Sequence, residues 1–286
     1  MTKNVALLLL ICTALVSTIT AQSLPAYQLF TAKGKKTDFG SLVKQAKKAD
    51  IILFGEYHNN PICHWIQWEL TDVLRQSGRL IAGAEMIETD NQEVLNSYLS
   101  GEIDQKSLDT LARLWNNHKT DYKPLVDLAK TYEFPFIATN IPRKYASKVF
   151  REGLESLEAL PDEEKRWIAP LPITYYPELP GYKNMLTMMG DHASENFPKA
   201  QAIKDATMAN SILKNYIQGY RFIHYHGTYH SDNYEGILWY LKTENPDLKY
   251  LTISTVSQKD LKKLEKEHLQ KADFILVVDD NMTTTY

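Results

Sequence analysis

The segment DIILFGEYH, residues 50–58, contains the two features from which the fold is predicted. Its first half is a run of large apolar residues without alternation, which is typical of a strand buried on both faces of a parallel sheet. Its second half, Gly55 to His58, is a Gly-x-x-His turn. The segment RFIHYHGTYH, residues 221–230, repeats this arrangement and ends in a second such turn, Gly227 to His230. The sequence therefore predicts two buried strands that are each followed by a turn carrying a histidine.

Short apolar runs elsewhere predict further strands, and the helical spacing of apolar residues predicts helices between them. The predicted strands span residues 50–55, 80–85, 134–139, 221–227, 249–255 and 273–278. The predicted helices span residues 61–76, 200–218 and 261–269. Because strands alternate with helices, we expect an α/β fold, with a mainly parallel β-sheet flanked by helices and joined by right-handed crossovers.

Two intervals are too long to be simple crossovers, and we predict that they form an inserted helical subdomain. The first insertion covers about residues 90–130 and the second about residues 143–198, where several prolines separate short amphipathic pieces. We expect the second insertion to cover the carboxyl edge of the sheet. No low-complexity linker interrupts the chain, so residues 22–286 are predicted to form one elaborated domain.

Residues 1–21 have the pattern of a signal peptide. A short, weakly positive start precedes an apolar run from Val5 to Val16, which is too short to span a bilayer, and a cleavage site is predicted after Ala21. The sequence therefore predicts export, to the periplasm or the cell envelope. Cys12 follows Ile11 instead of a small residue, so a lipoprotein anchor is not expected. Cys63 is then the single mature cysteine and cannot form an internal disulfide.

The charge balance argues against a nucleic-acid partner. The chain has 32 basic and 35 acidic residues, which gives no basic footprint for a phosphate backbone. We expect no nucleic acid among its ligands.

Polar and ionisable residues follow four consecutive predicted strands, and this convergence predicts the functional site. Ligands of parallel α/β sheets bind beyond the carboxyl ends of the strands. The residues found there are Glu56 and His58, then Glu85, then Arg143, and finally His230. A carboxylate at the end of an apolar strand is costly to bury unless it is paired or bound, so Glu85 is predicted to have a functional role.

Each of the other positions also has a structural interpretation. Glu56 and His58 could be polar turn residues, and Arg143 could cap a helix or pair with Glu85. His224 and His226 share one face of their strand and are expected to be hydrogen-bonded core residues. Two further side chains, His64 and Gln67, lie one helical turn apart and could face the site from the helix at residues 61–76.

Two chemistries fit this set of residues. A divalent metal ion could be held by Glu56, His58, Glu85 and His230. Alternatively, Glu85 could activate a water molecule without metal, with His58 and His230 as acid–base partners and Arg143 beside them. The sequence has neither a His-Glu-x-x-His motif nor a Gly-x-Ser-x-Gly elbow, so a zincin or a serine hydrolase is not supported.

The same motifs resemble those of the ChaN-like haem-binding proteins. The resemblance extends over nearly all of the mature chain. It rests on residues 55–58, on His64 and Gln67, and on residues 84–86, 114–115, 121–125, 138–143, 205–209 and 227–230. These proteins belong to a superfamily that includes Tiki proteases, TraB-like proteins and erythromycin-esterase-like hydrolases. In those relatives, the positions that resemble His58, Glu85 and His230 serve metal binding or hydrolysis.

The resemblance implies a haem-binding protein of an iron-uptake system, with haem held through a tyrosine at a homodimer interface. Axial tyrosine is an established ligand of haem iron. The candidate ligands are Tyr175, Tyr176 and Tyr182 in the second insertion. An outer-membrane haem receptor system is the implied partner. The alternative function is a hydrolase, either a peptidase or an esterase, that uses the two Gly-x-x-His turns and Glu85.

Overall fold

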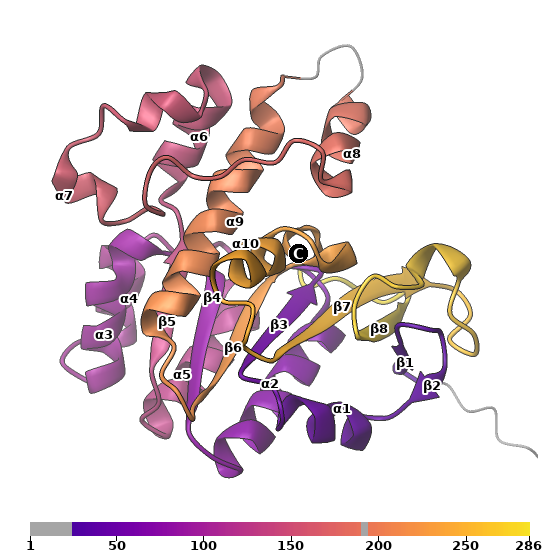
Figure 1. The fold of residues 1–286 in the computed structure, drawn as a ribbon. Helices are drawn as coiled ribbons and strands as arrows, with labels where there is room; N and C mark the ends of the chain where they lie inside the picture. Colours follow the sequence, from indigo (N-terminus) through magenta and orange to yellow (C-terminus); the bar gives the residue numbers. More distant parts are fainter. Residues whose placement is uncertain (1–24, 190–193) are drawn as a thin grey trace, which may run out of the picture.

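The computed structural model describes residues 25–189 and 194–286. The predicted signal peptide therefore lies outside the described residues. Within them the chain forms an eight-stranded sheet in the order β2-β1-β8-β7-β3-β6-β4-β5 (Figure 1). The strands are β1 (Tyr27–Thr31), β2 (Lys36–Thr37), β3 (Ile51–Glu56), β4 (Leu80–Glu88), β5 (Phe136–Asn140), β6 (Arg221–Gly227), β7 (Tyr250–Gln258) and β8 (Phe274–Asp279).

The sheet is mainly parallel, as the sequence predicts. Strands β8, β7, β3, β6, β4 and β5 run parallel to their neighbours, whereas β1 pairs antiparallel with β8 and with β2. All six predicted strands are present. The prediction missed β1 and β2, because a two-residue strand and its five-residue partner give too short a pattern to distinguish from a loop.

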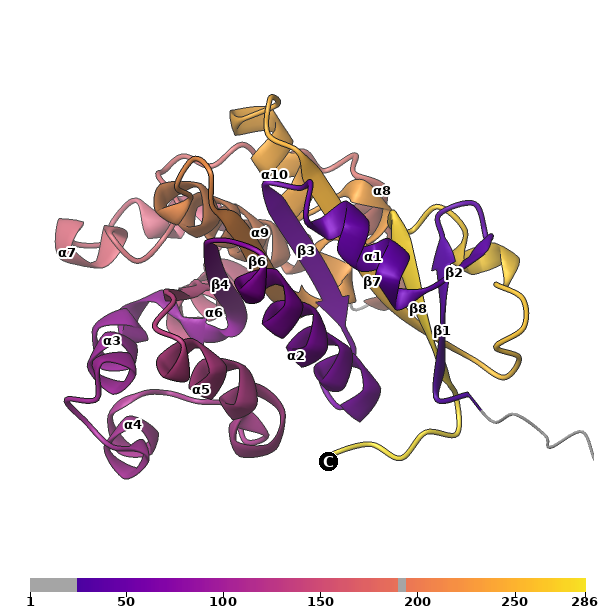
Figure 2. The same cartoon turned by 90° about the horizontal axis from the view of Figure 1, so that it is seen from below.

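Helices cover both faces of the sheet. Helices α1 (Phe39–Ala46), α2 (Pro61–Gln76) and α5 (Lys123–Thr131) lie on one face, and α9 (Asn196–Asn215) and α10 (Ile237–Glu244) lie on the other (Figures 1 and 2). In β3, Ile52 and Phe54 join the core on the α2 face, while Ile51 and Leu53 join the core on the α9 face. Both faces of β3 are apolar, which explains its continuous apolar run.

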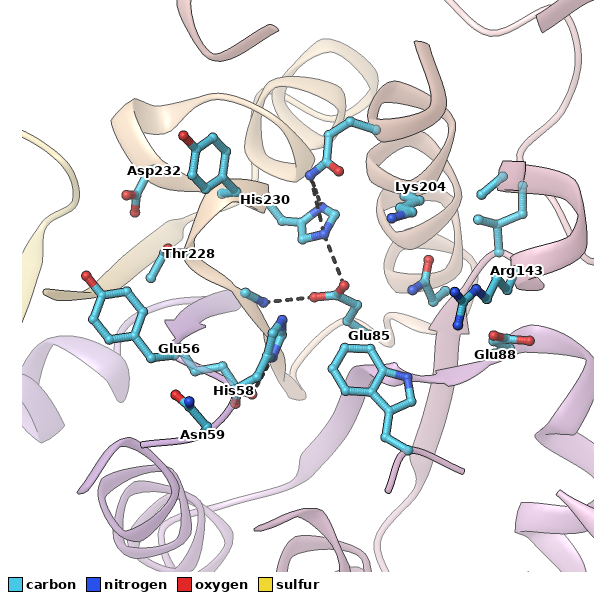
Figure 3. Close-up of a pocket in the computed structure, with 18 of the residues that line it drawn as sticks. Glu56, His58, Asn59, Glu85, Glu88, Arg143, Lys204, Thr228, His230 and Asp232 are labelled. Atoms are coloured by element: carbon cyan, nitrogen blue, oxygen red, sulfur yellow. Dashed lines mark hydrogen bonds and ion pairs between the residues drawn. The ribbon is translucent and has the colours of Figure 1, made fainter. Parts of the chain in front are cut away.

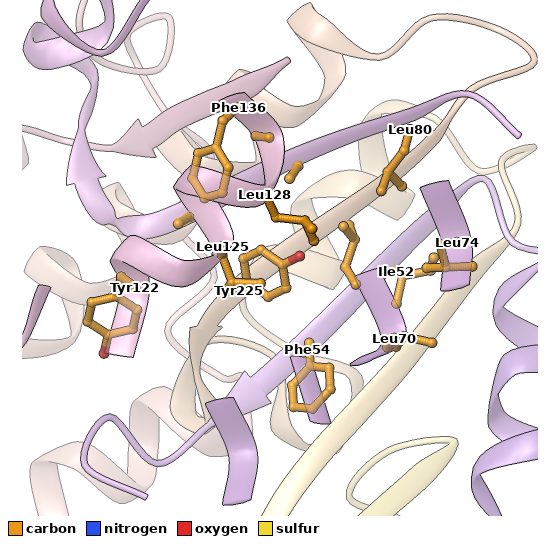
Figure 4. Packing of buried hydrophobic residues seen from close by; sticks show 14 of the residues in the cluster. Ile52, Phe54, Leu70, Leu74, Leu80, Tyr122, Leu125, Leu128, Phe136 and Tyr225 are labelled. Atoms are coloured by element: carbon orange, nitrogen blue, oxygen red, sulfur yellow. The ribbon is translucent and has the colours of Figure 1, made fainter. Parts of the chain in front are cut away.

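Side chains of β6 also alternate between the two faces of the sheet. Tyr225 packs among Phe54, Leu70 and Phe136 in the core on the α2 face (Figure 4). Its neighbours His224 and His226 lie on the other face, where their rings stack with centroids 5.0 Å apart. His224 contacts the hydroxyl of Thr139 through Nε2, at 2.7 Å. The expectation that these two histidines are hydrogen-bonded core residues is confirmed.

Helix α2 begins and ends where the sequence predicts. The side chain of Asn60 accepts the backbone N–H groups of Ile62 and Cys63, and Pro61 occupies the first helical turn, where no N–H donor is needed. Cys63 is fully buried in this helix, and burial raises the pKa of its thiol to about 12. The thiol is therefore a small core filler, not a nucleophile.

The predicted helix at residues 261–269 is wrong. This segment is a loop with a single 3₁₀ turn, Lys266–His268, because the buried side chain of Gln258 takes the hydrogen bonds that a helix would make. Its amide donates to the carbonyl groups of Asp260 and Lys263, and its carbonyl accepts the N–H of Glu265. A side chain just outside the segment thus outweighs the helical spacing within it.

The first insertion packs at the edge of the α2 layer and contains α3 (Gln92–Ser100), α4 (Gln105–Leu111), a π-helical segment (His118–Tyr122) and α5. The second insertion contains α6 (Arg143–Glu152), α7 (Asp162–Lys165), α8 (Pro180–Met189) and the start of α9. Figure 1 shows α6, α7 and α8 beyond the end of the sheet at which the parallel strands terminate. The other 3₁₀ turns of the described residues are Thr89–Asn91, Leu154–Leu157, Thr228–His230 and Asp232–Tyr234.

Within residues 25–189 and 194–286, no helix has both the length and the apolar composition that crossing a bilayer requires.

Candidate functional site

The two Gly-x-x-His turns lie against each other because Gly55 permits a close backbone approach. A Cβ atom on Gly55 would lie 3.1 Å from the Cα atom of Thr228 and 3.2 Å from the carbonyl oxygen of Ile253. Both atoms belong to the backbone and cannot move aside cheaply, so glycine fits here best. Gly227 has a similar role, since a Cβ atom there would lie 2.8 Å from Nε2 of His58. Gly55 therefore permits the two turns to approach, and Gly227 leaves the space that the ring of His58 occupies.

Glu56, the last residue of β3, organises the first cluster of the site. Its Oε1 atom lies 2.9 Å from Nδ1 of His58 and accepts a hydrogen bond of 2.8 Å from the hydroxyl of Tyr122. Its Oε2 atom accepts a hydrogen bond of 2.5 Å from Gln67. Burial acts to raise the pKa of Glu56, but the hydrogen bond with His58 and the charge of His64 outweigh burial, so this pKa is lowered. Glu56 is therefore an ionised residue that fixes the orientation of His58.

His58 projects from this cluster toward the cavity described below. Its side chain is 31% exposed, and its ring meets that of Trp115 edge-on at a centroid distance of 4.8 Å. Burial acts to lower the pKa of His58, but the hydrogen bond with Glu56 and the charge of Glu85 raise it above its ordinary value. An imidazole that is held by a carboxylate and faces a cavity can transfer protons.

Glu85 and His230 form the second cluster (Figure 3). The Oε1 atom of Glu85 lies 3.1 Å from Nε2 of His230, and its Oε2 atom accepts the backbone N–H of Gly227 at 2.8 Å. Burial acts to raise the pKa of Glu85, but the charge and hydrogen bond of His230 hold it well below its ordinary value. Strand β4 continues to Glu88, past the predicted end of the strand, and its pairing with β5 shifts register between Ala84 and Glu88. Such irregularities redirect side chains at functional sites.

His230 is a buried imidazolium between two carboxylates. Its Nδ1 atom lies 2.5 Å from Oδ1 of Asp205, opposite the contact with Glu85. Burial acts to lower the pKa of His230, but the charges of Glu85 and Asp205 raise it to about 9. The chain of contacts continues outward, since the hydroxyl of Tyr182 donates to Oδ2 of Asp205 at 2.9 Å. Burial raises the pKa of Asp205 although His230 and Tyr182 act to lower it.

Asp205 belongs to the site but was not predicted as a site residue from the sequence. It lies on α9, one helical turn after Gln201, whose amide nitrogen is 2.9 Å from Nδ1 of His230. The sequence feature that could have identified Asp205 is a pair of polar residues at i and i+4 on an otherwise apolar helix face. No sequence feature could have identified Tyr122, in the π-helical segment, because only the tertiary fold brings this residue to Glu56.

The four residues predicted to bind a metal form two separate pairs, Glu56 with His58 and Glu85 with His230. Within the described residues, one group of three side chains is close enough to share a metal ion, with ligand atoms all within 4.8 Å of one another. It consists of Glu265, Glu267 and His268, and none of these lines the cavity of the candidate site. Each histidine of the site instead uses a ring nitrogen to contact a carboxylate. The arrangement fits proton transfer better than metal coordination.

Arg143 is the first residue of α6 and lines the same cavity as Glu85. Of the two structural alternatives considered for it, pairing with Glu85 is not observed among the described residues, where Glu85 contacts His230 and Gly227. The backbone N–H of Arg143 is instead hydrogen-bonded to Glu88. Its guanidinium group remains on the cavity wall.

The three tyrosines predicted to bind haem lie in the second insertion but do not line this cavity. Tyr182 is 4% exposed and its hydroxyl is committed to Asp205. Tyr175 packs against Tyr182, with ring centroids 5.8 Å apart. Tyr176 is 50% exposed and its ring stacks on Trp239.

The candidate site opens into a cavity of about 1070 Å³ at the carboxyl edge of the sheet. This volume is slightly above the range of roughly 300–1,000 Å³ that is usual for sites that bind small molecules and cofactors. Both Gly-x-x-His turns, Glu85 and Arg143 lie on its wall (Figure 3). Aromatic rings supply much of the remaining surface, and they belong to Tyr57, Trp115, Phe197, Tyr229 and Tyr286.

Comparison with known families gives a match over most of the chain. The sequence model of the family described as "Haem-binding uptake, Tiki superfamily, ChaN" matches residues 42–241. Among curated proteins, none matches significantly.

Solved structures share the fold. A structure described as cofacial haem binding to ChaN of Campylobacter jejuni is 16% identical, covers 88% of this chain and 96% of its own, and has a TM-score of 0.67. A succinoglycan biosynthesis protein is 12% identical, with coverages of 89% and 94% and a TM-score of 0.53. A protein from Bacillus cereus is 11% identical, with coverages of 89% and 95% and a TM-score of 0.52.

Proposed function

This chain belongs to the ChaN family of haem-binding uptake proteins in the Tiki superfamily, and from that premise we propose that it binds haem in the cavity between its two Gly-x-x-His turns. The observation that carries the proposal is the cavity itself, which combines a volume of about 1070 Å³ with a wall rich in aromatic rings. Haem is a flat, largely apolar molecule, so contacts with such rings favour its transfer from water.

The side chains on the cavity wall fit the needs of haem iron. Ferric haem accepts an axial tyrosine, and Tyr229 offers a phenol group that is 53% exposed on this wall. It belongs to the second Gly-x-x-His turn, which Gly55 and the contact of His230 with Glu85 hold in place. We therefore propose Tyr229 as the axial ligand, in place of the three tyrosines of the second insertion.

A haem titration tests the proposal. Adding ferric haem to the purified mature protein should shift the Soret band in a saturable way, with one haem bound per chain. Serum albumin and buffer alone serve as references for specific and unspecific haem association. A spectrum that changes only as it does in buffer would overturn the proposal.

Export and transfer to a receptor complete the proposed role. The signal-like residues 1–21 support a protein of the periplasm or cell envelope, and the uptake function of the family supports an outer-membrane haem receptor system as its partner. The structure of the C. jejuni protein is described as cofacial haem binding. We propose that two copies of this chain associate, and sedimentation with and without haem measures that association.

A second candidate function is a metal-free hydrolase, and one observation favours it. The continuous contacts from Glu85 through His230 to Asp205 resemble an acid–base relay that faces an open cavity. A panel of peptide and ester substrates tests this candidate, with the variant Glu85→Gln and the control Glu88→Gln, which changes a carboxylate of the same cavity. Turnover that is lost in Glu85→Gln and kept in Glu88→Gln would support a hydrolase. A wild-type protein that turns over no substrate in the panel would exclude it for those substrate classes.

A further inference from the structure

Two cations without ion pairs lie on the same side of the cavity. Arg143 begins α6 and Lys204 lies on α9, and the two helices pack against each other. Figure 3 shows both side chains on the side of the cavity opposite Asp232 and Thr228. Within residues 25–189 and 194–286, neither forms an ion pair. In contrast, the other basic side chains of the cavity are occupied, Arg113 by Glu88 and Lys271 by Asp232.

The N-terminus of α6 lies on the wall of the same cavity. The positive end of the α6 dipole is at residue 143, three residues after Asn140, which ends β5 and is 8% exposed. The buried Oδ1 atom of Asn140 has no hydrogen-bond partner, but it is an acceptor and cannot bind a carboxylate. This part of the cavity therefore provides two cations and a helix N-terminus for an anionic group.

We infer that Arg143 and Lys204 bind the propionate carboxylates of haem. This inference rests on the proposed haem-binding function. The nearby carboxylates should repel the propionates only weakly, because Glu88 is paired with Arg113 and Glu85 is paired with His230. Charge-assisted hydrogen bonds to carboxylates are about twice as strong as neutral ones, and the planar guanidinium group matches a carboxylate in two-point contact. The subsite would orient the propionates toward α6 and α9.

Comparing haem with its dimethyl ester tests this subsite, because the ester keeps the macrocycle and iron but has no carboxylate charge. We expect the double variant Arg143→Met/Lys204→Met to lose about tenfold in affinity for haem and to bind the ester as tightly as the wild type does. The control is Arg151→Met/Lys199→Met, which removes the same charge from the same two helices away from the cavity. We expect the control to bind both ligands like the wild type.

The outcomes separate this inference from the proposed function. Suppose that the wild type binds haem, and that the double variant loses the same affinity for haem and ester or loses no affinity for either ligand. The subsite is then overturned, while the proposed haem binding stands. If the wild type binds neither ligand, the proposed function itself fails, and the subsite fails with it. A loss restricted to haem supports the subsite.

Discussion

Replacing Tyr229 by phenylalanine should weaken the binding of ferric haem on the order of 100-fold, because the change removes the axial oxygen and keeps the aromatic ring. Tyr229 follows Thr228 in the second Gly-x-x-His turn and lies on the cavity wall with 53% of its surface exposed. Tyr229 is not a member of the apolar core on either face of the sheet, and the ring is kept, so the free energy of unfolding should change by roughly 0.5 kcal/mol or less. Haem titrations followed at the Soret band measure the affinity, and denaturant unfolding measures the stability.

Two other tyrosine variants provide the comparison for Tyr229→Phe. Tyr176→Phe changes an exposed ring that stacks on Trp239, and Tyr182→Phe removes the donor to Asp205. Neither residue lines the cavity, so both variants should bind haem within about twofold of the wild type. A large loss of affinity in one of them, with normal binding by Tyr229→Phe, would instead place the haem in the second insertion.

Replacing His230 by leucine should lower the free energy of unfolding by about 3–5 kcal/mol at pH 7. His230 is 5% exposed and lies between Glu85 and Asp205, at 3.1 Å and 2.5 Å from their oxygen atoms. A leucine side chain would fill similar space but would leave two buried carboxylates without their cation. Urea unfolding of the wild type and the variant measures the difference.

His118→Leu is a matched control for this substitution. His118 is also buried, at 4% exposure, but burial lowers its pKa and its Nε2 atom has no hydrogen-bond partner. Its replacement removes a neutral ring without leaving a charge behind, so the cost should be about 1 kcal/mol or less. Equal losses in His118→Leu and His230→Leu would contradict the role assigned to the two carboxylates.

The stability of the wild type should fall as pH rises through about 9, and this dependence should be absent in His230→Leu. The pKa of His230 is raised from 6.5 to about 9 in the folded state. The folded state therefore binds the proton more tightly than the unfolded state, which stabilises it fully below pH 6.5 and progressively less as pH approaches and passes 9. The difference between the two pKa values corresponds to about 3 kcal/mol. Urea unfolding at a series of pH values from 6 to 10 measures the effect, and identical slopes in both proteins would contradict it.

The local sequence was sufficient to predict the sheet and most of its connections. Continuous apolar runs predicted all six strands of the parallel part, because a strand covered on both faces needs apolar residues at every position. The cap at Asn60 and the proline after it fixed the start of α2. The helix expected at residues 261–269 is absent because Gln258 binds the backbone of that loop from outside the segment.

The sequence also predicted that Glu56, His58, Glu85 and His230 lie at one edge of the sheet. This prediction required only that parallel strands end at the same edge, and the cavity brings all four together. How they pair was decided by the tertiary structure. The strand order places β3 beside β6 and β6 beside β4, so Glu85 meets His230 while Glu56 holds His58.

The remaining partners of the site come from segments whose place only the complete fold determines. Asp205 reaches His230 from α9, and Tyr122 reaches Glu56 from the first insertion, across separations of 25 and 66 residues. The prediction that Tyr182 binds haem was made from the family resemblance, whereas the structure commits its hydroxyl to Asp205. Local patterns determine which residues become strands, helices and turns, because those depend on neighbouring residues. Contacts between distant segments depend on strand order and helix packing, so the tertiary structure alone decided which charges compensate each other and which, such as Arg143 and Lys204, remain available to a ligand.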